Sequence, residues 1–211
     1  MPQHTLVQVD GSTVYGLWHI AESEEALLNQ LQLTPTEHVM YKQITHLHRR
    51  LSWLAARAML QRLCISLGYA YTGVLKNHWG QPYVATPGVY ISLAHCFPWA
   101  LAAVSQGAPI GIDIQLPSQK LHRVQHKYLS RSEIQDAAGD LGKLCVYWCA
   151  KEAIYKAYGG CGRISLRGGI RVRPFVKENM GWVQGFVNVG GGYVVRYGLH
   201  EGYVLTYGKG R

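Results

Sequence analysis

Closely spaced apolar residues mark the first twenty positions of the chain and predict extended structure there. They fall at residues 6–9 and 14–20, in runs of the kind that favour β-strands. Asp10-Gly11 lies between the two runs, and this residue pair is typical of a tight turn. We therefore expect residues 5–20 to form a strand broken by a turn.

Helical spacing of apolar residues follows. Ser23, with two glutamates after it, is predicted to begin a short helix, and Thr34-Pro35 is predicted to end it and begin the next. The helical pattern continues over residues 36–67, and Gly68 is placed to stop it. One side of this region is basic, which by itself is most simply a solvated helix face.

The middle of the chain predicts strands again. A turn-rich connector at residues 77–82 precedes three strand-like runs, at residues 89–94, 99–105 and 110–116. The sequence Gln-Gly-Ala-Pro at residues 106–109 separates the last two runs and favours a hairpin between them.

Helices and then strands are predicted for the rest. Helical patterns cover residues 118–129, a short segment that begins with the capping box Ser130-x-x-Glu133, and a long window from Asp140 to Gly159-Gly160. Strands rich in Val, Tyr and Gly follow at residues 164–172, 182–189, 193–199 and 203–207. The order of elements predicts an α+β fold whose sheets are antiparallel.

Composition narrows the class of protein. The chain has 211 residues, nearly half of them apolar, which is enough for a real core and excludes a disordered protein. The five cysteines are odd in number and none forms Cys-x-x-Cys, as expected for reduced thiols. Because the chain shows no apolar run of membrane-spanning length and no secretory signal, we expect a cytoplasmic protein that binds no membrane.

The net charge of +9, with a pI near 9.4, favours polyanionic partners. Nucleic acid, a phosphorylated small molecule and an acidic protein all meet this requirement, so charge alone does not choose among them.

Asp113 is a single carboxylate within an otherwise apolar strand pattern, on the same side as Gln115. A buried aspartate needs a counter-charge, and Mg²⁺ is one that prefers oxygen ligands. The alternative is that Asp113 caps a turn or pairs with a lysine.

The long helix could supply a second carboxylate. Glu152 and Lys156 lie one turn apart and outside a narrow stripe of small apolar residues, which would let the helix approach a sheet closely. If the helix packs across the strand of Asp113, then Glu152 completes a metal site, and Lys151, Lys156 and the arginines of residues 48–57 help to bind phosphate. Taken alone, Glu152 and Lys156 are most simply a surface ion pair.

The chain resembles the 4′-phosphopantetheinyl transferases, and most closely the larger monomeric type named after the surfactin-synthetase enzyme. The resemblance is carried by Gly-Ile-Asp at residues 111–113 and by Trp-Cys-Ala-Lys-Glu-Ala-x-x-Lys at residues 148–156. Weaker matches are Arg-Leu-Ser-Trp-Leu-Ala-Ala-Arg at residues 50–57, Gly-Gln-Pro at residues 80–82, and the segment that ends in His95-Cys96.

The resemblance implies a pseudo-dimer of two similar α+β halves, residues 1–108 and 109–211, with a ligand cleft between them. It implies a monomer that moves phosphopantetheine from coenzyme A to a serine of an acyl or peptidyl carrier protein, with Mg²⁺ or Mn²⁺ as cofactor. The residue roles that it implies are metal binding by Asp113, Gln115 and Glu152, catalysis by Glu152 and Lys156, and coenzyme A binding by Arg50, Arg57, His95, Lys151 and Lys156.

Three departures from the family pattern bear on these roles. Gln115 stands where the family often has a third acidic ligand, Gln81 replaces a common lysine, and Ala94 replaces a serine. Carrier domains tend to be acidic, so the positive charge of the chain would favour their docking. The competing interpretations are a nucleic-acid-binding module, which the basic pI and many aromatic residues would suit, and a silent relative that only binds coenzyme A.

Overall fold

The computed structural model describes residues 3–159 and 164–210, which divide into two compact units, Met1–Ala108 and Pro109–Arg211. Each unit has its own hydrophobic core. Helices and antiparallel strands occur in both units, so the α+β class predicted from the sequence is confirmed at this level.

Unit 1 contains a four-stranded antiparallel sheet in the order β1-β2-β6-β5. The predicted turn at residues 10–11 joins the first two strands. A separate two-stranded ribbon flanks the connector at residues 77–82. The strands of unit 1 are β1 (Gln3–Asp10), β2 (Thr13–His19), β3 (Leu75–Lys76), β4 (Pro82–Tyr83), β5 (Val89–Cys96) and β6 (Trp99–Gln106).

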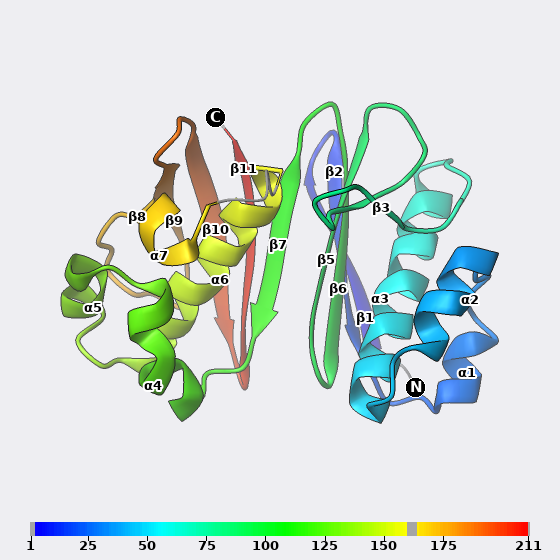
Figure 1. The fold of residues 1–211 in the computed structure, drawn as a ribbon, viewed down its shortest axis with the longest axis horizontal. Coiled ribbons are helices and arrows are strands. Elements are labelled where there is room, and N and C mark those ends of the chain that lie inside the picture. Colours follow the sequence, from blue (N-terminus) through cyan, green and yellow to red (C-terminus); the bar gives the residue numbers. More distant parts are fainter. Residues whose placement is uncertain (1–2, 160–163, 211) are drawn as a thin grey trace. The chain divides into compact units, whose positions relative to one another are not determined.

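The first two helices of unit 1 begin at the predicted residues. Ser23 caps α1 by accepting a hydrogen bond from a backbone amide, and Thr34 forms a capping box with Glu37 at the start of α2. The third helix lies against the sheet (Figure 1). The helices are α1 (Glu24–Leu28), α2 (Pro35–Lys42) and α3 (Leu47–Ser66).

The helical pattern over residues 36–67 is interrupted. Residues 43–46 break it between α2 and α3. Ile44 and Thr45 are adjacent β-branched residues, which are weaker helix formers than straight-chain residues. The end of α3 follows the prediction, since Gly68 adopts the left-handed conformation at φ +79°.

The predicted hairpin at residues 106–109 is wrong. The strand before it pairs with β5 and β2, whereas the strand after it, β7 (Ile110–Gln115), belongs to the sheet of unit 2. The Gln-Gly-Ala-Pro segment is therefore a connection between units, and the true hairpin joins β5 to β6 across residues 97–98. A turn signal identifies a change of direction but does not identify the strand that pairs next.

Unit 2 is a five-stranded antiparallel sheet in the order β7-β11-β10-β9-β8. The remaining strands are β8 (Ile170–Val172), β9 (Met180–Val187), β10 (Gly192–His200) and β11 (Tyr203–Gly210). Its helices are α4 (Gln119–Tyr128), α5 (Arg131–Ala137), α6 (Leu141–Ala157) and α7 (Leu166–Gly169). The predicted caps at Ser130 and Asp140 both form.

One predicted strand is partly wrong. Residues 164–172 contain the short helix α7 before β8, because the Ser165 side chain accepts a hydrogen bond from the amide of Gly168 and closes a helical turn. Gly159 has φ +93° directly after α6, as expected of a helix stop, while the predicted contribution of Gly160 lies outside the described residues.

The helix α6 packs directly on β7 and β11 (Figure 1). A Cβ atom added to Gly111 would lie 1.7 Å from the carbonyl oxygen of Ala153. Thr206 on β11 donates its hydroxyl to the carbonyl oxygen of Cys149 at 3.1 Å. The stripe of small residues on α6 and the glycine on β7 therefore allow the two backbones to approach closely, which confirms the predicted packing of this helix across the strand of Asp113.

Membrane-spanning helices do not occur in the described part of the chain, where no helix is both long enough and apolar enough.

Candidate functional site

Asp113 lies on β7 with its side chain largely buried, and it pairs with Lys156 of α6. The Lys156 Nζ atom donates to Asp113 Oδ1 at 2.8 Å and to the carbonyl oxygen of Ile112 at 2.8 Å. Pairing of Asp113 with a lysine was one of the alternatives that the sequence left open. The partner is the residue that was predicted to bind phosphate, so both interpretations concern the same lysine.

Glu152 lies one turn before Lys156 on the same helix and close enough to Asp113 for the two carboxylates to interact. Burial raises the pKa of Glu152 most, and the negative charge of Asp113 raises it further, while the Lys156 ammonium opposes both effects. Among the described residues, Glu152 has no hydrogen bond or ion pair, so the surface pair of Glu152 with Lys156 does not form.

These three side chains form what we call the carboxylate cluster: Asp113, Glu152 and Lys156. Two carboxylates share one cation in partly buried surroundings, which leaves one negative charge uncompensated. Such a pair is suited to hold a divalent cation, to accept a proton, or to do both.

Gln115 lies two residues after Asp113 and therefore on the same side of β7. Its amide nitrogen donates to the carbonyl oxygen of Leu116 at 3.2 Å, so the amide oxygen is the group it can offer to a cation. Among residues 3–159 and 164–210, no group of three or more His, Cys, Asp or Glu side chains could hold a metal ion. The donor set is two carboxylates and one amide, which fits Mg²⁺ if water and substrate phosphates complete its coordination.

Lys151 does not lie where it could bind a ligand, contrary to the sequence prediction. Its side chain is fully buried, and its Nζ atom lies 2.8 Å from Glu133 Oε2 and 2.9 Å from the carbonyl oxygens of Tyr128, Leu166 and Ile170. Burial lowers the pKa of Lys151, and the Glu133 carboxylate opposes this effect. Lys151 is therefore a structural residue that ties α6 to α4, α5 and the start of β8.

The sequence identified one role of the carboxylate that pairs with Lys151, but not the ion pair itself. Glu133 was identified as a capping-box residue, and it does cap α5 by accepting from the amide of Ser130 at 2.7 Å. The same carboxylate also accepts from Lys151 and from the amide of Val172. Pattern reasoning assigned one partner to a carboxylate that has three.

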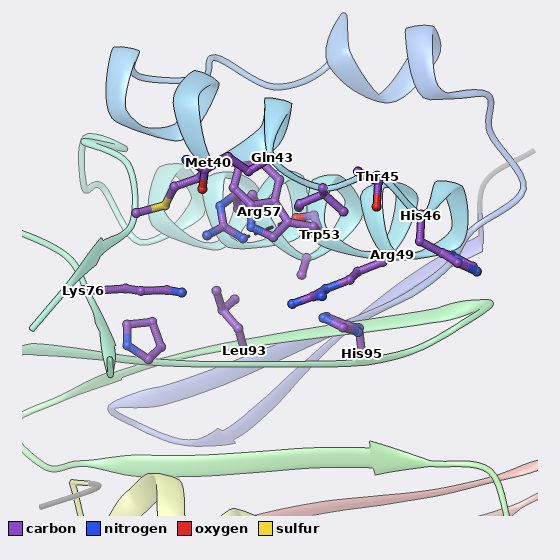
Figure 2. Close-up of a pocket in the computed structure, with 13 residues that line it drawn as sticks. Met40, Gln43, Thr45, His46, Arg49, Trp53, Arg57, Lys76, Leu93 and His95 are labelled. Atoms are coloured by element: carbon purple, nitrogen blue, oxygen red, sulfur yellow. Dashed lines mark hydrogen bonds between the residues drawn. The ribbon is translucent and has the colours of Figure 1, made fainter. Parts of the chain in front are cut away.

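Unit 1 contains a pocket of about 530 Å³ that gathers basic side chains (Figure 2). Arg49 reaches it from α3, Lys76 from β3 and His95 from β5, and these side chains point into the same space. All three are exposed, and Arg49 and Lys76 have no ion pair among the described residues. We call this the basic pocket, and its other lining residues are Met40, Gln43, Ile44, Thr45, His46, Trp53, Ala56, Arg57, Pro82 and Leu93.

The two arginines predicted to bind coenzyme A occupy different places. Arg50 is not among the residues that line the basic pocket, and it pairs with Glu24, its Nε atom lying 2.7 Å from Oε1. Arg57 lines the pocket, but its guanidinium is nearly buried, stacks on Trp53 and donates to Glu37 at 3.1 Å. Burial lowers the pKa of Arg57, while Glu37 opposes this effect.

Residues 109–179 match the model of the 4′-phosphopantetheinyl transferase superfamily. No curated protein matches the chain. The matched segment is about a third of the chain and includes β7 and α6, hence the whole carboxylate cluster. The match supports phosphopantetheinyl transfer as the general activity.

The superfamily match does not extend to unit 1, so the basic pocket is known from geometry alone. Of its basic side chains, Lys76 is the one that the sequence did not single out. Lys76 pairs in register with Pro82 across the β3–β4 ribbon, next to Gln81, where a lysine is common in the family. The Gln81 side chain instead accepts a hydrogen bond from Asn77 at 3.2 Å.

Proposed function

We propose that this protein transfers the 4′-phosphopantetheine group of coenzyme A to a serine of an acyl or peptidyl carrier protein. The observation that carries the proposal is the carboxylate cluster, which lies within the residues that match the transferase superfamily. The serine oxygen would form a bond to the β-phosphorus of coenzyme A as the pyrophosphate bond breaks. Adenosine 3′,5′-bisphosphate leaves with the electron pair of that bond.

Glu152 is the group that we propose to accept the serine proton. A raised pKa brings a carboxylate closer to the range in which it can take and release a proton near neutral pH. The Glu152 carboxylate has no direct partner among the described residues, so one of its oxygens is open to accept the proton.

Lys156 is proposed to stabilise the charge that develops on the departing phosphate. Its ammonium already lies against a carboxylate and a carbonyl oxygen at 2.8 Å, so its position is fixed before a substrate binds. A charge that is oriented in advance costs no reorganisation during the reaction.

Asp113 and Glu152 are the residues that would hold Mg²⁺, with the amide oxygen of Gln115 as a third donor. When bound there, the cation supplies charge neutralisation for the pyrophosphate oxygens. The support for this part of the proposal is the uncompensated negative charge of the cluster.

The basic pocket is proposed to bind the phosphate groups at the nucleotide end of coenzyme A. Arg49, Lys76 and His95 supply donors of the kind that recognise phosphate. Arg57 would act by orienting Trp53 and the pocket wall instead of by direct contact with a phosphate.

Mass spectrometry tests the proposed reaction. The protein is incubated with coenzyme A, Mg²⁺ and several apo carrier proteins, and the expected result is a carrier that gains the mass of the phosphopantetheine arm. Release of adenosine 3′,5′-bisphosphate should match that gain. A protein that shifts nucleic acid in a gel but modifies no carrier would contradict the proposal and favour a nucleic-acid-binding module.

A further inference from the structure

A second pocket, of about 780 Å³, lies within unit 2 on α5, α7 and β8. Three arginines line it, one from each of these elements: Arg131, Arg167 and Arg171. We call it the arginine pocket. Its volume falls within the range of about 300–1,000 Å³ that is usual for small-molecule sites.

Within the described part of the chain, the side chains of the three arginines make no contact of their charged groups that would stabilise the fold. All three are exposed, and among the described residues none of their guanidinium groups has a hydrogen bond, an ion pair or an aromatic ring to stack on. Several other arginines of this chain do have such partners. Arg173, two residues after Arg171, donates to Gln184 at 3.0 Å and lies over the ring of Phe186. Three unpaired guanidinium groups around one cavity repel one another, and an anion would relieve that repulsion.

The rest of the lining is polar and uncharged. It consists of three serines, one glutamine and one glycine, with no acidic and no apolar side chain among the described lining residues. Protein-docking surfaces depend on buried apolar anchors, and single-stranded nucleic acid is held by stacking on aromatic rings. The lining offers neither, whereas arginines with hydroxyl groups are suited to bind phosphate oxygens.

The arginine pocket is separate from the carboxylate cluster. Arg171 lies on β8 and Asp113 on β7, which are the opposite edge strands of the five-stranded sheet. Four strand spacings of about 4.8 Å put these edges roughly 19 Å apart. A ligand that fills the arginine pocket would therefore not be the pyrophosphate that the carboxylate cluster acts on.

The elements that line the arginine pocket are held in place by the side chain of Lys151 on α6. The buried Lys151 ammonium binds the carbonyl oxygens of Leu166 and Ile170, each next to a pocket arginine, and also the carboxylate that caps α5. A single buried cation thus fixes all three elements that carry the arginines. A site that is organised before binding loses less entropy when the ligand arrives.

We infer that the arginine pocket binds a small anion that carries two or more phosphoryl groups. The inference does not depend on the proposed transferase activity. Inorganic pyrophosphate is the simplest probe of this class, and inorganic phosphate is the matched probe with one phosphoryl group.

Calorimetric titration in EDTA tests the inference, because without divalent cations the probe has no metal at the carboxylate cluster to bind. We expect saturable binding of pyrophosphate that is tighter than that of phosphate. The variant Arg167→Gln/Arg171→Gln should bind pyrophosphate at least about tenfold more weakly, as expected for loss of charge-assisted hydrogen bonds. Arg196→Gln, which removes an exposed arginine on β10 outside the pocket, should change the affinity by less than about twofold.

Hydrogen exchange on the unaltered protein gives a test that does not depend on how a variant folds. Pyrophosphate should slow exchange in peptides that cover residues 130–135 and 165–171. The inference is overturned if the protection instead falls on the basic pocket, near Arg49 and Lys76. Equal losses of affinity in the arginine-pocket and Arg196 variants would also overturn it, since binding would then reflect net charge alone.

Discussion

Lys156 donates to Asp113 at 2.8 Å across 43 residues of sequence, and this contact joins the helix α6 to the strand β7 at the carboxylate cluster. The lysine compensates Asp113 directly and Glu152 only at longer range. Glu152 is therefore the residue of the cluster whose charge is least well tolerated by the folded chain.

The stability of the metal-free protein should fall as the pH rises through the titration of Glu152. The pKa of this carboxyl is raised in the folded protein, so in the pH range just above its unfolded value the folded state binds more protons than the unfolded state. Urea unfolding in EDTA at several pH values above 4.5 measures the slope, and Glu152→Gln should reduce it. An unchanged slope in this variant would mean that Glu152 titrates normally.

Gly111→Ala should destabilise the protein by about 3 kcal/mol or more, because the new methyl group would lie 1.7 Å from the Ala153 carbonyl oxygen. The helix would have to move away from β7, and the carboxylate cluster would open. Gly11→Ala is the matched control, since nothing lies within 4 Å of its added Cβ. Denaturant unfolding of the two variants should therefore differ clearly, and equal stabilities would refute the close packing.

Lys151→Met should cost about 3–5 kcal/mol of unfolding free energy, because it leaves the buried Glu133 carboxylate without its cation. Lys177→Met removes a lysine from the half-exposed pair with Asp140 and should cost less than about 1 kcal/mol. Thermal or urea unfolding compares them. If the Lys151 variant were as stable as the Lys177 variant but bound coenzyme A poorly, the role in ligand binding predicted from the sequence would be right after all.

Arg49 and Arg50 are neighbours on α3, but only Arg49 lines the basic pocket. Arg49→Gln should weaken coenzyme A binding by about tenfold, the loss expected for one charge-assisted contact, because Arg49 points into the pocket. Arg50→Gln should have little effect on affinity and should instead weaken the attachment of α1, since Arg50 pairs with Glu24. Calorimetric titration with coenzyme A checks both, and the reverse order of effects would place the nucleotide end of the ligand elsewhere.

The sequence predicted those features that depend on local chemistry. The caps at Thr34, Ser130 and Asp140 form because a side-chain oxygen needs only an amide two or three residues away. The approach of α6 to β7 was also predictable. The stripe of small residues allows the helix to lie close to a strand, and the carboxylate within the apolar strand needs a counter-charge that the helix can supply.

The features that it did not predict depend on contacts between distant segments. The strands that pair with β6 are determined by contacts between distant segments. The turn residues at 106–109 could therefore not reveal that the next strand, β7, belongs to the sheet of the other unit. Lys151 and Lys156 are both lysines on one helix, and only the packed structure shows that one faces the interior and the other faces Asp113. Arg49 and Arg50 are adjacent, but successive residues of a helix point about 100° apart, so only Arg49 lines the pocket.

The carboxylate cluster is the proposed site of transfer, and the rate of carrier-protein modification tests this assignment most directly. Mass spectrometry should follow the gain of the phosphopantetheine arm at saturating coenzyme A and Mg²⁺ for the unaltered protein and for Glu152→Gln. We predict steady modification by the former and a rate at least about 100-fold lower for the variant, with its fold intact by circular dichroism. Modification at the normal rate by Glu152→Gln would contradict the assignment of the cluster as the site of transfer.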